Sequence, residues 1–339
     1  MGHISKRLKI LIALLAASLL VGGPGLAQTP PLTKVRVGYL HSEPIDVPLV
    51  HGMQSGYFRD QNIELQLVKF DNGTQINQAL AGGSLDTALA GAGVVQNFAV
   101  QGNGTVFAFA YIDDNDLYAN PALGVRSVSD LAGKQVAFPL GTTANVLVYW
   151  SAEEAGIGYR SVKQVNTGYG NTAAALISGA VPSAVVFGAY TRLVNREKPD
   201  FVKIADLKKF FPKRAVFGGF VASNEFRQAN RAALVNLETA YLKSYDEIWR
   251  DAGARRKVYD LAYVKDESFE DFERNIAGLP KFPSTDEWMN YLKDGSIAGW
   301  ALDVAETLKS VGALKTIGDP KMFLDEGIIT EAYERYRKK

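Results

Sequence analysis

The segment INQALAGGSLDTALAG at residues 76–91 aligns without a gap with TAAALISGAVPSAVVF at residues 172–187. The alignment places Gly83 on Gly179, and an Ala-Leu pair precedes each glycine. Each copy begins as an apolar helix, stops at the glycine and restarts as a short apolar strand, because the residue after a helix often needs a left-handed backbone. Two such units predict two similar α/β lobes with loops facing each other across a cleft. The alternative is chance similarity between two Ala/Gly-rich segments.

The first residues have the pattern of a secretory signal peptide. Three basic residues precede the apolar run Ile10–Val21, which Gly-Gly-Pro at 22–24 interrupts. Gly-Leu-Ala at 25–27 places small residues at the positions that signal peptidase recognises, so we expect residues 1–27 to be removed and the mature chain to begin at Gln28. The run is too short to span a bilayer comfortably, although an uncleaved anchor is the alternative.

The composition excludes several classes of protein. The net charge is +1 for the whole chain and −2 after the predicted cleavage, which leaves no broad basic face for nucleic acid. The chain has no cysteine, and therefore no disulfide, thiolate metal site or cysteine nucleophile. Lipid attachment at a signal cleavage site also needs cysteine. We therefore expect a freely diffusing monomer in the periplasm, without a lipid anchor.

Apolar strands and helical segments alternate along most of the chain. In the first half, strands are expected at 35–40, 63–70, 85–90 and 105–111, and helices at 47–58, 73–81 and 94–101. A second series has strands at 134–138 and 162–165 and helices at 143–155 and 190–197, with the second copy of the opening segment between them. This alternation predicts a largely parallel sheet in each lobe, covered by helices on both faces.

The predicted domain boundaries follow from two changes in this pattern. The polar patch Asp113–Asp116, followed by Asn-Pro, indicates a crossing into the second lobe at 113–120, and the apolar strand FGGFVAS indicates the return at 215–223. The division is a signal peptide at 1–27, a first lobe at 28–112 and 224–339, and a second lobe at 121–214. From Asn224 onward the pattern is mostly helical, and we expect the charged C-terminal tail to pack loosely.

The order of these segments resembles a known family. The resemblance is carried by VRVGYLHSEPIDVPLVHGMQSGYFRDQNIELQLVKFDNGTQINQALAGGSLDTALAGAG, which includes the glycine-aromatic pattern at Gly56-Tyr57-Phe58, and by SVSDLAGKQVAFPLGTT. The chain is similar to the periplasmic substrate-binding proteins of ABC importers for nitrate, taurine and aliphatic sulfonates, a group related to thiamine-precursor binding proteins. The similarity covers essentially the whole mature chain.

The resemblance implies an α/β fold of two lobes, the type II periplasmic binding protein fold. Each lobe is expected to be a mainly parallel sheet flanked by helices, with a cleft between the lobes. The family resemblance also implies that the lobes close on a small molecule and deliver it to an ABC permease in the inner membrane. No cofactor and no metal are expected.

Four loops are candidates for the ligand site, because ligands of open α/β sheets bind beyond the carboxyl ends of the strands. Gly91-Ala92-Gly93 and Gly141-Thr142-Thr143 each precede a helix, where backbone N–H groups and the helix start favour an anion. For both, the alternative is a plain tight turn, with a threonine N-cap in the second. The other candidates are His41-Ser42-Glu43 after the first strand and Phe187-Gly188 with Tyr190 in the second lobe. Phe187 and Tyr190 either wall the pocket or belong to the core.

The charges near these loops bear on the ligand. Glu43 and Asp114 suit an ammonium group such as that of taurine, unless they lie in a solvated loop and a solvated crossing. No lysine or arginine falls in the four loops, which weakens the case for nitrate. The favoured ligand is a small anionic or zwitterionic solute, either taurine or an aliphatic sulfonate. A pyrimidine or an aromatic carboxylate is the alternative.

Other classes of function lack their sequence signals. A serine hydrolase of the α/β type would carry G-x-S-x-G, and a zinc protease H-E-x-x-H; neither pattern occurs. The iron-using pyrimidine synthases related to this fold carry a cysteine-rich motif, which this chain lacks. We therefore predict a binding protein that is not an enzyme, with an exported sensor or an enzyme on the same fold as the alternative.

Overall fold

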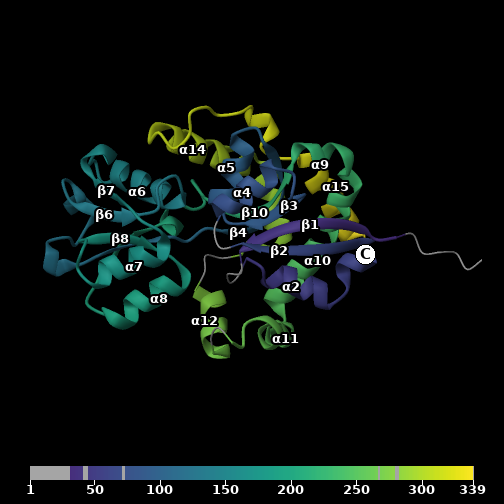
Figure 1. Ribbon diagram of the computed structural model, residues 1–339, viewed down its shortest axis with the longest axis horizontal. Coiled ribbons are helices and arrows are strands. Elements are labelled where there is room, and N and C mark those ends of the chain that lie inside the picture. The colour runs from purple at the N-terminus through teal and green to yellow at the C-terminus, as the bar shows by residue number, and fades with distance from the viewer. Residues whose placement is uncertain (1–30, 41–44, 71–72, 266–267, 279–281, 339) are drawn as a thin grey trace, which may run out of the picture. The chain divides into compact units, whose positions relative to one another are not determined.

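Two five-stranded sheets of the same design organise the chain (Figure 1). The computed structural model describes residues 31–40, 45–70, 73–265, 268–278 and 282–338. The predicted signal peptide and the predicted mature start at Gln28 therefore lie outside the described residues. Both sheets belong to one compact unit, Thr33–Lys339.

The first sheet has the strand order β2-β1-β3-β10-β4. Its strands are β1 (Thr33–Leu40), β2 (Ile63–Phe70), β3 (Thr87–Ala90), β4 (Gly104–Ile112) and β10 (Phe217–Ser223). The helices between them are α2 (Val47–Gln54), α3 (Tyr57–Asp60), α4 (Gly73–Ala81) and α5 (Ala92–Val100). Strand β1 pairs in parallel with β2 and β3, whereas β10 is antiparallel to both β3 and β4. We call this sheet with its helices the first lobe.

The second sheet repeats this plan with the order β7-β6-β8-β5-β9. Its strands are β5 (Asp116–Ala119), β6 (Gln135–Phe138), β7 (Lys163–Asn166), β8 (Ser183–Val186) and β9 (Val202–Asp206). The α-helices are α6 (Thr143–Glu154), α7 (Tyr169–Ile177) and α8 (Gly188–Glu197), with short 3-10 turns at Pro121–Leu123, Val128–Leu131, Tyr159–Ser161 and Leu207–Phe210. Strand β6 is parallel to β7 and β8, and β5 is antiparallel to β8 and β9. We call this sheet with its helices the second lobe.

The predicted α/β class with mainly parallel sheets is confirmed, with one reversed strand in each sheet. Strand β5 follows β4 of the first sheet, and β10 follows β9 of the second, so each reversed strand is entered from the other lobe. The ranges that we expected to be crossings, 113–120 and 215–223, thus contain β5 and β10. The chain passes between the sheets at 113–115 and at 207–216, so the first segment is shorter than the predicted crossing and the second lies mostly before the predicted one.

The two copies of the opening segment adopt the same local structure. Gly83 ends the α4 turn with φ 69°, and Gly179 ends the α7 turn with φ 77°. The residue after each glycine donates its backbone N–H to the carbonyl five positions earlier, over 3.0 Å in the first copy and 2.9 Å in the second. This is the hydrogen-bond pattern of a helix closed by a left-handed residue. The expected helix stop is therefore present in both lobes.

The helix predicted at 47–58 is two helices. Gly56, with φ 76°, separates α2 from α3, since a left-handed residue cannot continue a helix. Asp46 is the residue before α2, but its side chain makes no capping hydrogen bond. Its buried carboxylate instead accepts a hydrogen bond from the Tyr263 hydroxyl, which ties the start of α2 to a later helix.

The C-terminal third is helical, as expected. Its helices are α9 (Asn224–Ala229), α10 (Arg231–Arg250), α11 (Ala252–Ala262), α12 (Phe269–Gly278), α13 (Thr285–Lys293), α14 (Ser296–Ser310) and α15 (Glu326–Arg337), with a 3-10 turn at Pro320–Met322. Helix α10 packs on the first lobe, and α14 packs against both α5 and α6. Over the residues that the structure describes, no helix is long and apolar enough to cross a membrane.

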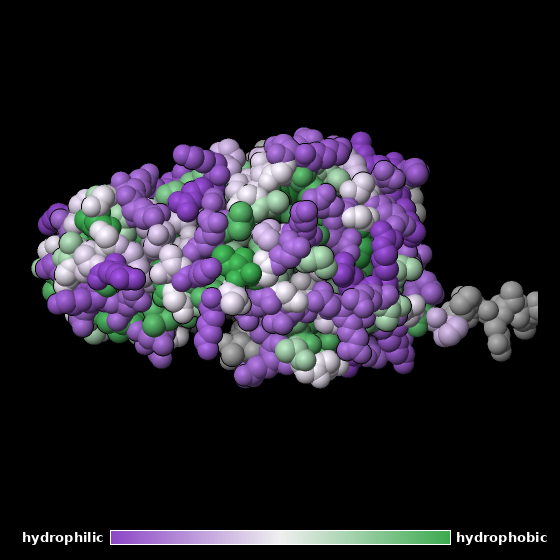
Figure 2. Space-filling model, turned by 90° about the horizontal axis from the view of Figure 1, so that it is seen from above, coloured by the Kyte–Doolittle hydropathy of each residue, from purple (hydrophilic) through white to green (hydrophobic). Residues whose placement is uncertain are grey.

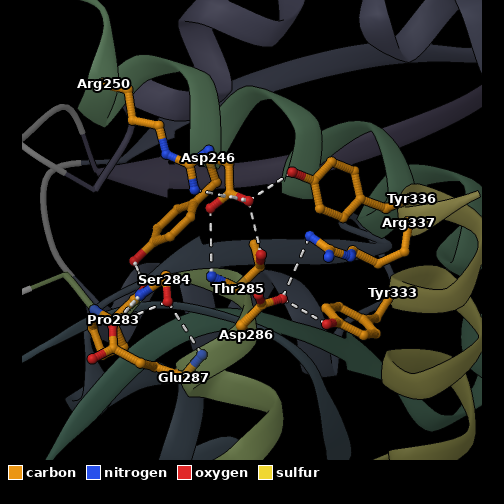
Figure 3. A network of polar contacts seen from close by, with 11 residues as sticks. Asp246, Arg250, Pro283, Ser284, Thr285, Asp286, Glu287, Tyr333, Tyr336 and Arg337 are labelled. Carbon is orange, nitrogen blue, oxygen red and sulfur yellow. Dashed lines mark hydrogen bonds and ion pairs between the residues drawn. The ribbon is translucent and has the colours of Figure 1, made fainter. Parts of the chain in front are cut away.

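The prediction that the C-terminal tail packs loosely is wrong. Leu324 forms a parallel bridge with Val106 of β4, and Ile328 of α15 is fully buried. The Tyr336 hydroxyl donates to the Asp246 carboxylate over 2.6 Å, within a polar network between α10, α13 and α15 (Figure 3). The charged residues of the tail occupy the outer face of an amphipathic helix, and the sequence count of charges concealed its apolar face.

Candidate functional site

In the first lobe, the predicted loop Gly91-Ala92-Gly93 forms the start of α5. Gly91 is the N-cap residue, and Ala92 and Gly93 are the first two residues of the helix. The N-cap glycine has no side chain to cap this end, so the first backbone N–H groups depend on other partners. A Cβ atom on Gly91 would lie 2.8 Å from the Tyr111 hydroxyl oxygen, whereas a Cβ on Gly93 would meet nothing within 4 Å. Among the residues that the structure describes, the start of α5 thus has open space beside Gly93.

In the second lobe, Gly141-Thr142-Thr143 forms the start of α6. Gly141 has φ 76°, and Thr142 is the N-cap. The Thr142 hydroxyl accepts from the Ala144 N–H over 3.3 Å and donates to the Pro139 carbonyl over 2.8 Å. The sequence-level alternative, a tight turn with a threonine N-cap, therefore describes the local geometry of this loop.

Three asparagines that the sequence analysis did not single out hold this second loop. The Asn145 carbonyl accepts from the Gly141 N–H, and its amide donates to the buried Tyr159 hydroxyl, each over 2.5 Å. Asn166 at the end of β7 accepts from the Leu140 N–H over 3.1 Å. A third, Asn97, comes from the other lobe. The partners of Asn97 and Asn166 are backbone groups 44 and 26 positions away, so nothing in the sequence spacing signals the role of these two residues.

The two predicted loops meet through Asn97. This residue lies on α5, four positions after Gly93, and its amide donates to the Gly141 carbonyl over 3.2 Å. Gly141 also lies beside Ala313, just after α14, because a Cβ on Gly141 would be 3.9 Å from the Ala313 Cβ. The start of α6 is therefore in contact with the same helix that carries the first-lobe loop.

The acidic patch at the crossing is buried, so the interpretation as a solvated linker is wrong. Asp113 is 8% exposed, Asn115 2% and Asp116 8%. Burial raises the pKa of Asp113 to about 6, although hydrogen bonds from Thr143 and two backbone N–H groups lower it. The pKa of Asp114 is raised to about 7, first by burial and then by the charge of Asp113. Carboxyl groups with such raised pKa values often mark functional sites.

This patch connects the crossing to the starts of two second-lobe helices. The Asp113 N–H donates to the Val216 carbonyl over 2.7 Å, which pairs the two chain crossings. The Asn115 amide donates to the Thr143 hydroxyl of α6 over 2.6 Å. Thr191 of α8 donates to the Asp116 carboxylate over 3.2 Å, and Lys203 lies 3.2 Å from the other oxygen of that carboxylate.

The loop before α8 brings two aromatic residues together. Phe187 is the N-cap of α8, and its ring lies edge-on to that of Tyr190 with centroids 5.9 Å apart. Gly188 has φ 49°. Both rings are partly exposed, as expected for residues between a core and an open surface. The fourth predicted loop, with His41, Ser42 and Glu43, lies outside the described residues.

The described part of the candidate site offers a ligand helix N-termini, side-chain amides, hydroxyl groups and buried carboxyl groups. Within the described ranges, no group of three or more histidine, aspartate or glutamate residues could hold a metal ion. Leu140, which precedes Gly141, is 45% exposed and adds an apolar side chain to the loop. A single leucine in a loop carries no pattern that marks it as a ligand residue in the sequence.

A family model described as NMT1/THI5 like matches residues 44–252. The chain belongs to this family. The predicted relationship to periplasmic binding proteins related to thiamine-precursor binding proteins is thereby confirmed at the level of the family. The match covers parts of both lobes, from α2 through α10, and so includes three of the four predicted loops; the fourth, at 41–43, lies just before it.

Comparison with individual proteins gives distant relatives of similar length. A Brucella abortus (strain 2308) protein, whose name describes a candidate binding protein, is 24% identical over 290 residues, covering 85% of this chain and 88% of the relative.

Solved structures show the periplasmic binding protein fold. The periplasmic sulfonate-binding protein SsuA of a candidate sulfonate ABC transporter from Methylobacillus flagellatus KT is 20% identical with a TM-score of 0.73, covering 91% of this chain and 96% of that one. The periplasmic nitrate-binding protein NrtA from Synechocystis PCC 6803 is 14% identical with a TM-score of 0.64, covering 91% and 90%. At these sequence identities the similarity shows that the fold is shared, and nothing more.

Proposed function

We propose that this protein is the periplasmic solute-binding component of an ABC importer. It captures a small anionic or zwitterionic organic solute, with taurine or an aliphatic sulfonate favoured, and delivers it to a permease in the inner membrane. The observation that carries the proposal is the contact of Asn97 with Gly141, which brings the start of α6 to the helix that begins at Gly91. Membership of the family and the sulfonate-binding protein among the structural neighbours support it.

The proposed site uses the starts of α5 and α6 for the anionic end of the solute. Backbone N–H groups at the start of a helix bind anions without a lysine or arginine, which matches the absence of basic residues from the four loops. Gly91-Ala92-Gly93 and Gly141-Thr142-Thr143 supply these groups. Asp114, and His41, Ser42 and Glu43 of the first-lobe loop, remain proposed ligand residues. No step of this role requires a catalytic residue, a cofactor or a metal.

Movement of the lobes is part of the proposal. The chain passes between the sheets in two short stretches next to Asp113 and Val216, and short crossings allow hinge rotation with little loss of packing. We propose the first lobe as 28–112 with 224–339 and the second as 121–214, with the β5 and β10 ends at the hinge. Opening of the lobes would break the hydrogen bond between Asn97 and Gly141.

Export and a monomeric state complete the proposal. The signal-peptide pattern at 1–27, without a cysteine for lipid attachment, supports a freely diffusing periplasmic protein. The face in Figure 2 is largely hydrophilic, with hydrophobic residues in small separate patches. A stable protein interface needs a larger continuous area, so this face does not favour a dimer.

An aromatic solute is the second candidate, and one observation favours it. The partly exposed rings of Phe187 and Tyr190 stand edge to face at the start of α8, a position from which they can pack against a flat ring. A pyrimidine or an aromatic carboxylate would use this pair, whereas a short sulfonate would leave it largely unused.

Native mass spectrometry of the protein purified from the periplasm tests the proposal. We expect a mature chain that begins at Gln28, with a co-purified molecule of sulfonate or zwitterion mass in part of the sample. Thermal-shift assays with taurine, short alkanesulfonates, nitrate, aromatic carboxylates and aminopyrimidines then rank the solutes. A ligand present at a hundredfold excess over Kd adds about 2.7 kcal/mol to the free energy of unfolding. A full-length, membrane-bound product, or no shift with any solute class, would contradict the proposal.

A further inference from the structure

The hydrogen-bond inventory at the start of α6 leaves acceptors without donors. The Asn115 amide has two N–H groups, and these donate to the Asp113 carboxylate over 3.2 Å and to the Thr143 hydroxyl over 2.6 Å. Thr143 lies close enough to the Asp113 carboxyl group to lower its pKa. The Asp114 backbone N–H donates to the same carboxylate over 2.8 Å. Both side-chain N–H groups of Asn115 are therefore in use.

The direction of this chain of bonds fixes the orientation of the Asn115 side chain. Its nitrogen faces two oxygen atoms, so exchanging the amide nitrogen and oxygen would place an oxygen against a carboxylate. The Asn115 Oδ1 atom is then the remaining polar atom of the amide. It is buried and has no hydrogen-bond partner among the residues that the structure describes, in a residue that is 2% exposed.

A second asparagine repeats this arrangement from the other lobe. The Asn97 amide nitrogen donates to the Gly141 carbonyl, and its Oδ1 is likewise buried without a partner in the described part of the chain. The two side chains thus contact the start of α6 from the crossing and from the first lobe, and each leaves one carbonyl oxygen without a partner among the described residues. A buried polar atom without a partner is uncommon and calls for a water or a ligand.

Building on the proposed function, we infer that the solute carries a hydrogen-bond donor, an ammonium or amino group, which Asn115 and Asn97 bind through their Oδ1 atoms. The anionic or aromatic body of the solute lies toward the helix starts. A simple alkanesulfonate or nitrate offers only acceptors and would leave both oxygens unpaired. An ammonium group has three donors, enough for both asparagines and one further acceptor such as the Asp113 carboxylate.

Matched pairs of probes test this inference, because each pair differs only in a donor group and a methyl group of the same size. Taurine is compared with propane-1-sulfonate, and 4-amino-2-methylpyrimidine with 2,4-dimethylpyrimidine, by calorimetric titration of the wild-type protein. In whichever solute class binds, we expect the donor-bearing member to bind at least about tenfold more tightly, since an unpaired buried acceptor is costly. Equal affinities within a pair would overturn the inference and leave the proposed function standing.

Two variants assign the preference to Asn115. Asn115→Leu keeps the volume and removes the acceptor together with the two amide N–H groups that bind Asp113 and Thr143, and we expect the preference within the binding pair to fall below about threefold. Asn195→Leu is the control, since Asn195 on α8 accepts a hydrogen bond from Tyr118 and has no place in the proposed site; it should retain the full preference. A preference that persists in Asn115→Leu would overturn the assignment to Asn115. If that variant fails to fold, the comparison on the wild-type protein still decides whether a donor is required.

Failure of every probe to bind the wild-type protein would bear on the proposed function as well as on this inference. If none of the four probes binds the wild-type protein, the sulfonate and pyrimidine classes both fail, and this inference fails with them. Equal affinities for propane-1-sulfonate and taurine, by contrast, support the sulfonate-binding role and contradict only the inferred requirement for a donor group.

Discussion

The two lobes share one strand order, but they hold their candidate ligand loops by different means. At the start of α6 in the second lobe, Thr142 caps the helix and Asn145 binds the Gly141 N–H. At the start of α5 in the first lobe, Gly91 occupies the N-cap position without a side-chain cap. The second-lobe loop is therefore built as a fixed surface, whereas the first-lobe loop presents bare backbone.

At the opposite ends of these strands, away from the candidate ligand loops, the first lobe has the polar anchor and the second lobe lacks it. In the first lobe, the Asp86 carboxylate accepts from the Arg36 backbone N–H over 2.8 Å and from its guanidinium Nε over 3.1 Å, which ties β1 to β3. The aligned residue in the second lobe is Pro182, which has no such group. Apolar patterning thus sets the common topology, and each lobe adds its polar anchors at a different end.

The largest effect is expected from removing the anchor of the second-lobe loop. Asn145→Ala deletes two hydrogen bonds from a residue that is 2% exposed and leaves the Tyr159 hydroxyl and the Gly141 N–H without their partner. We expect a loss of about 3 kcal/mol in the free energy of unfolding, measured by urea denaturation.

Asn97→Ala is the matched control, since Asn97 binds the same residue, Gly141, from the other lobe through one bond of 3.2 Å. We expect it to cost less than about 1 kcal/mol. Equal losses in the two variants would mean that the loop is fixed as much from the first lobe as from its own.

A smaller loss is expected from breaking the anchor of the first lobe. Asp86→Ala removes the carboxylate that ties β1 to β3, but the Arg36 side chain is 42% exposed and can be solvated afterwards. We therefore expect a loss of about 2 kcal/mol. Pro182→Ala, at the aligned position, should cost under about 1 kcal/mol, mainly through the unfolded state. Equal unfolding midpoints for these two variants would refute the proposed difference between the lobes.

The fold was predictable from the sequence because its signals are local. Gly83 and Gly179 mark helix ends through their need for a left-handed backbone, and both adopt it. The strand at 63–70 and the helix at 73–81 have the predicted limits. The C-terminal tail was mispredicted because its charge count hides the buried face of α15, which only a partner helix reveals.

The candidate site was only partly predictable. The loops at Gly91 and Gly141 follow from strand ends and small residues, and the structure brings α5 into contact with the second of them. The roles of Asn97, Asn115 and Asn145 depend on tertiary contacts, and no spacing in the sequence announces them. The burial of Asp113 was missed for the same reason, since a run of acidic residues is usually solvated.

The contribution that the carboxyl groups of the crossing make to stability should change with pH in the opposite direction to the contribution of an exposed capping carboxylate. Burial raises the pKa of Asp114 to about 7, so its contribution to stability is complete below the unfolded value near 3.8 and is lost as the pH rises through about 7. Asp114→Asn should therefore melt at a higher temperature than the wild type near pH 8, with little difference near pH 4.

Asp130→Asn provides the contrast. Backbone and side-chain hydrogen bonds from Arg126 and Ser127 lower the pKa of the exposed Asp130, so its contribution is present above about pH 4 and lost in acid. This variant should melt at a lower temperature than the wild type near pH 8. Melting curves recorded by circular dichroism near pH 4 and near pH 8 test both expectations. A change of Tm in the same direction in both variants near pH 8 would contradict the opposite pKa shifts of the two carboxyl groups.

The smallest stability changes distinguish the two glycines at the bare start of α5. Gly91→Ala places a Cβ 2.8 Å from the Tyr111 hydroxyl oxygen and should cost about 1 kcal/mol. The Cβ of Gly93→Ala meets no described atom within 4 Å and improves the helix propensity, so this variant should add about 0.5 kcal/mol. If the open space beside Gly93 is where the solute approaches the backbone, the same methyl group should weaken binding of whichever probe the wild type binds. A loss of affinity in a more stable protein cannot come from unfolding, so it would place the solute at this helix start. Unchanged affinity in Gly93→Ala would instead confine the site to the second-lobe loop.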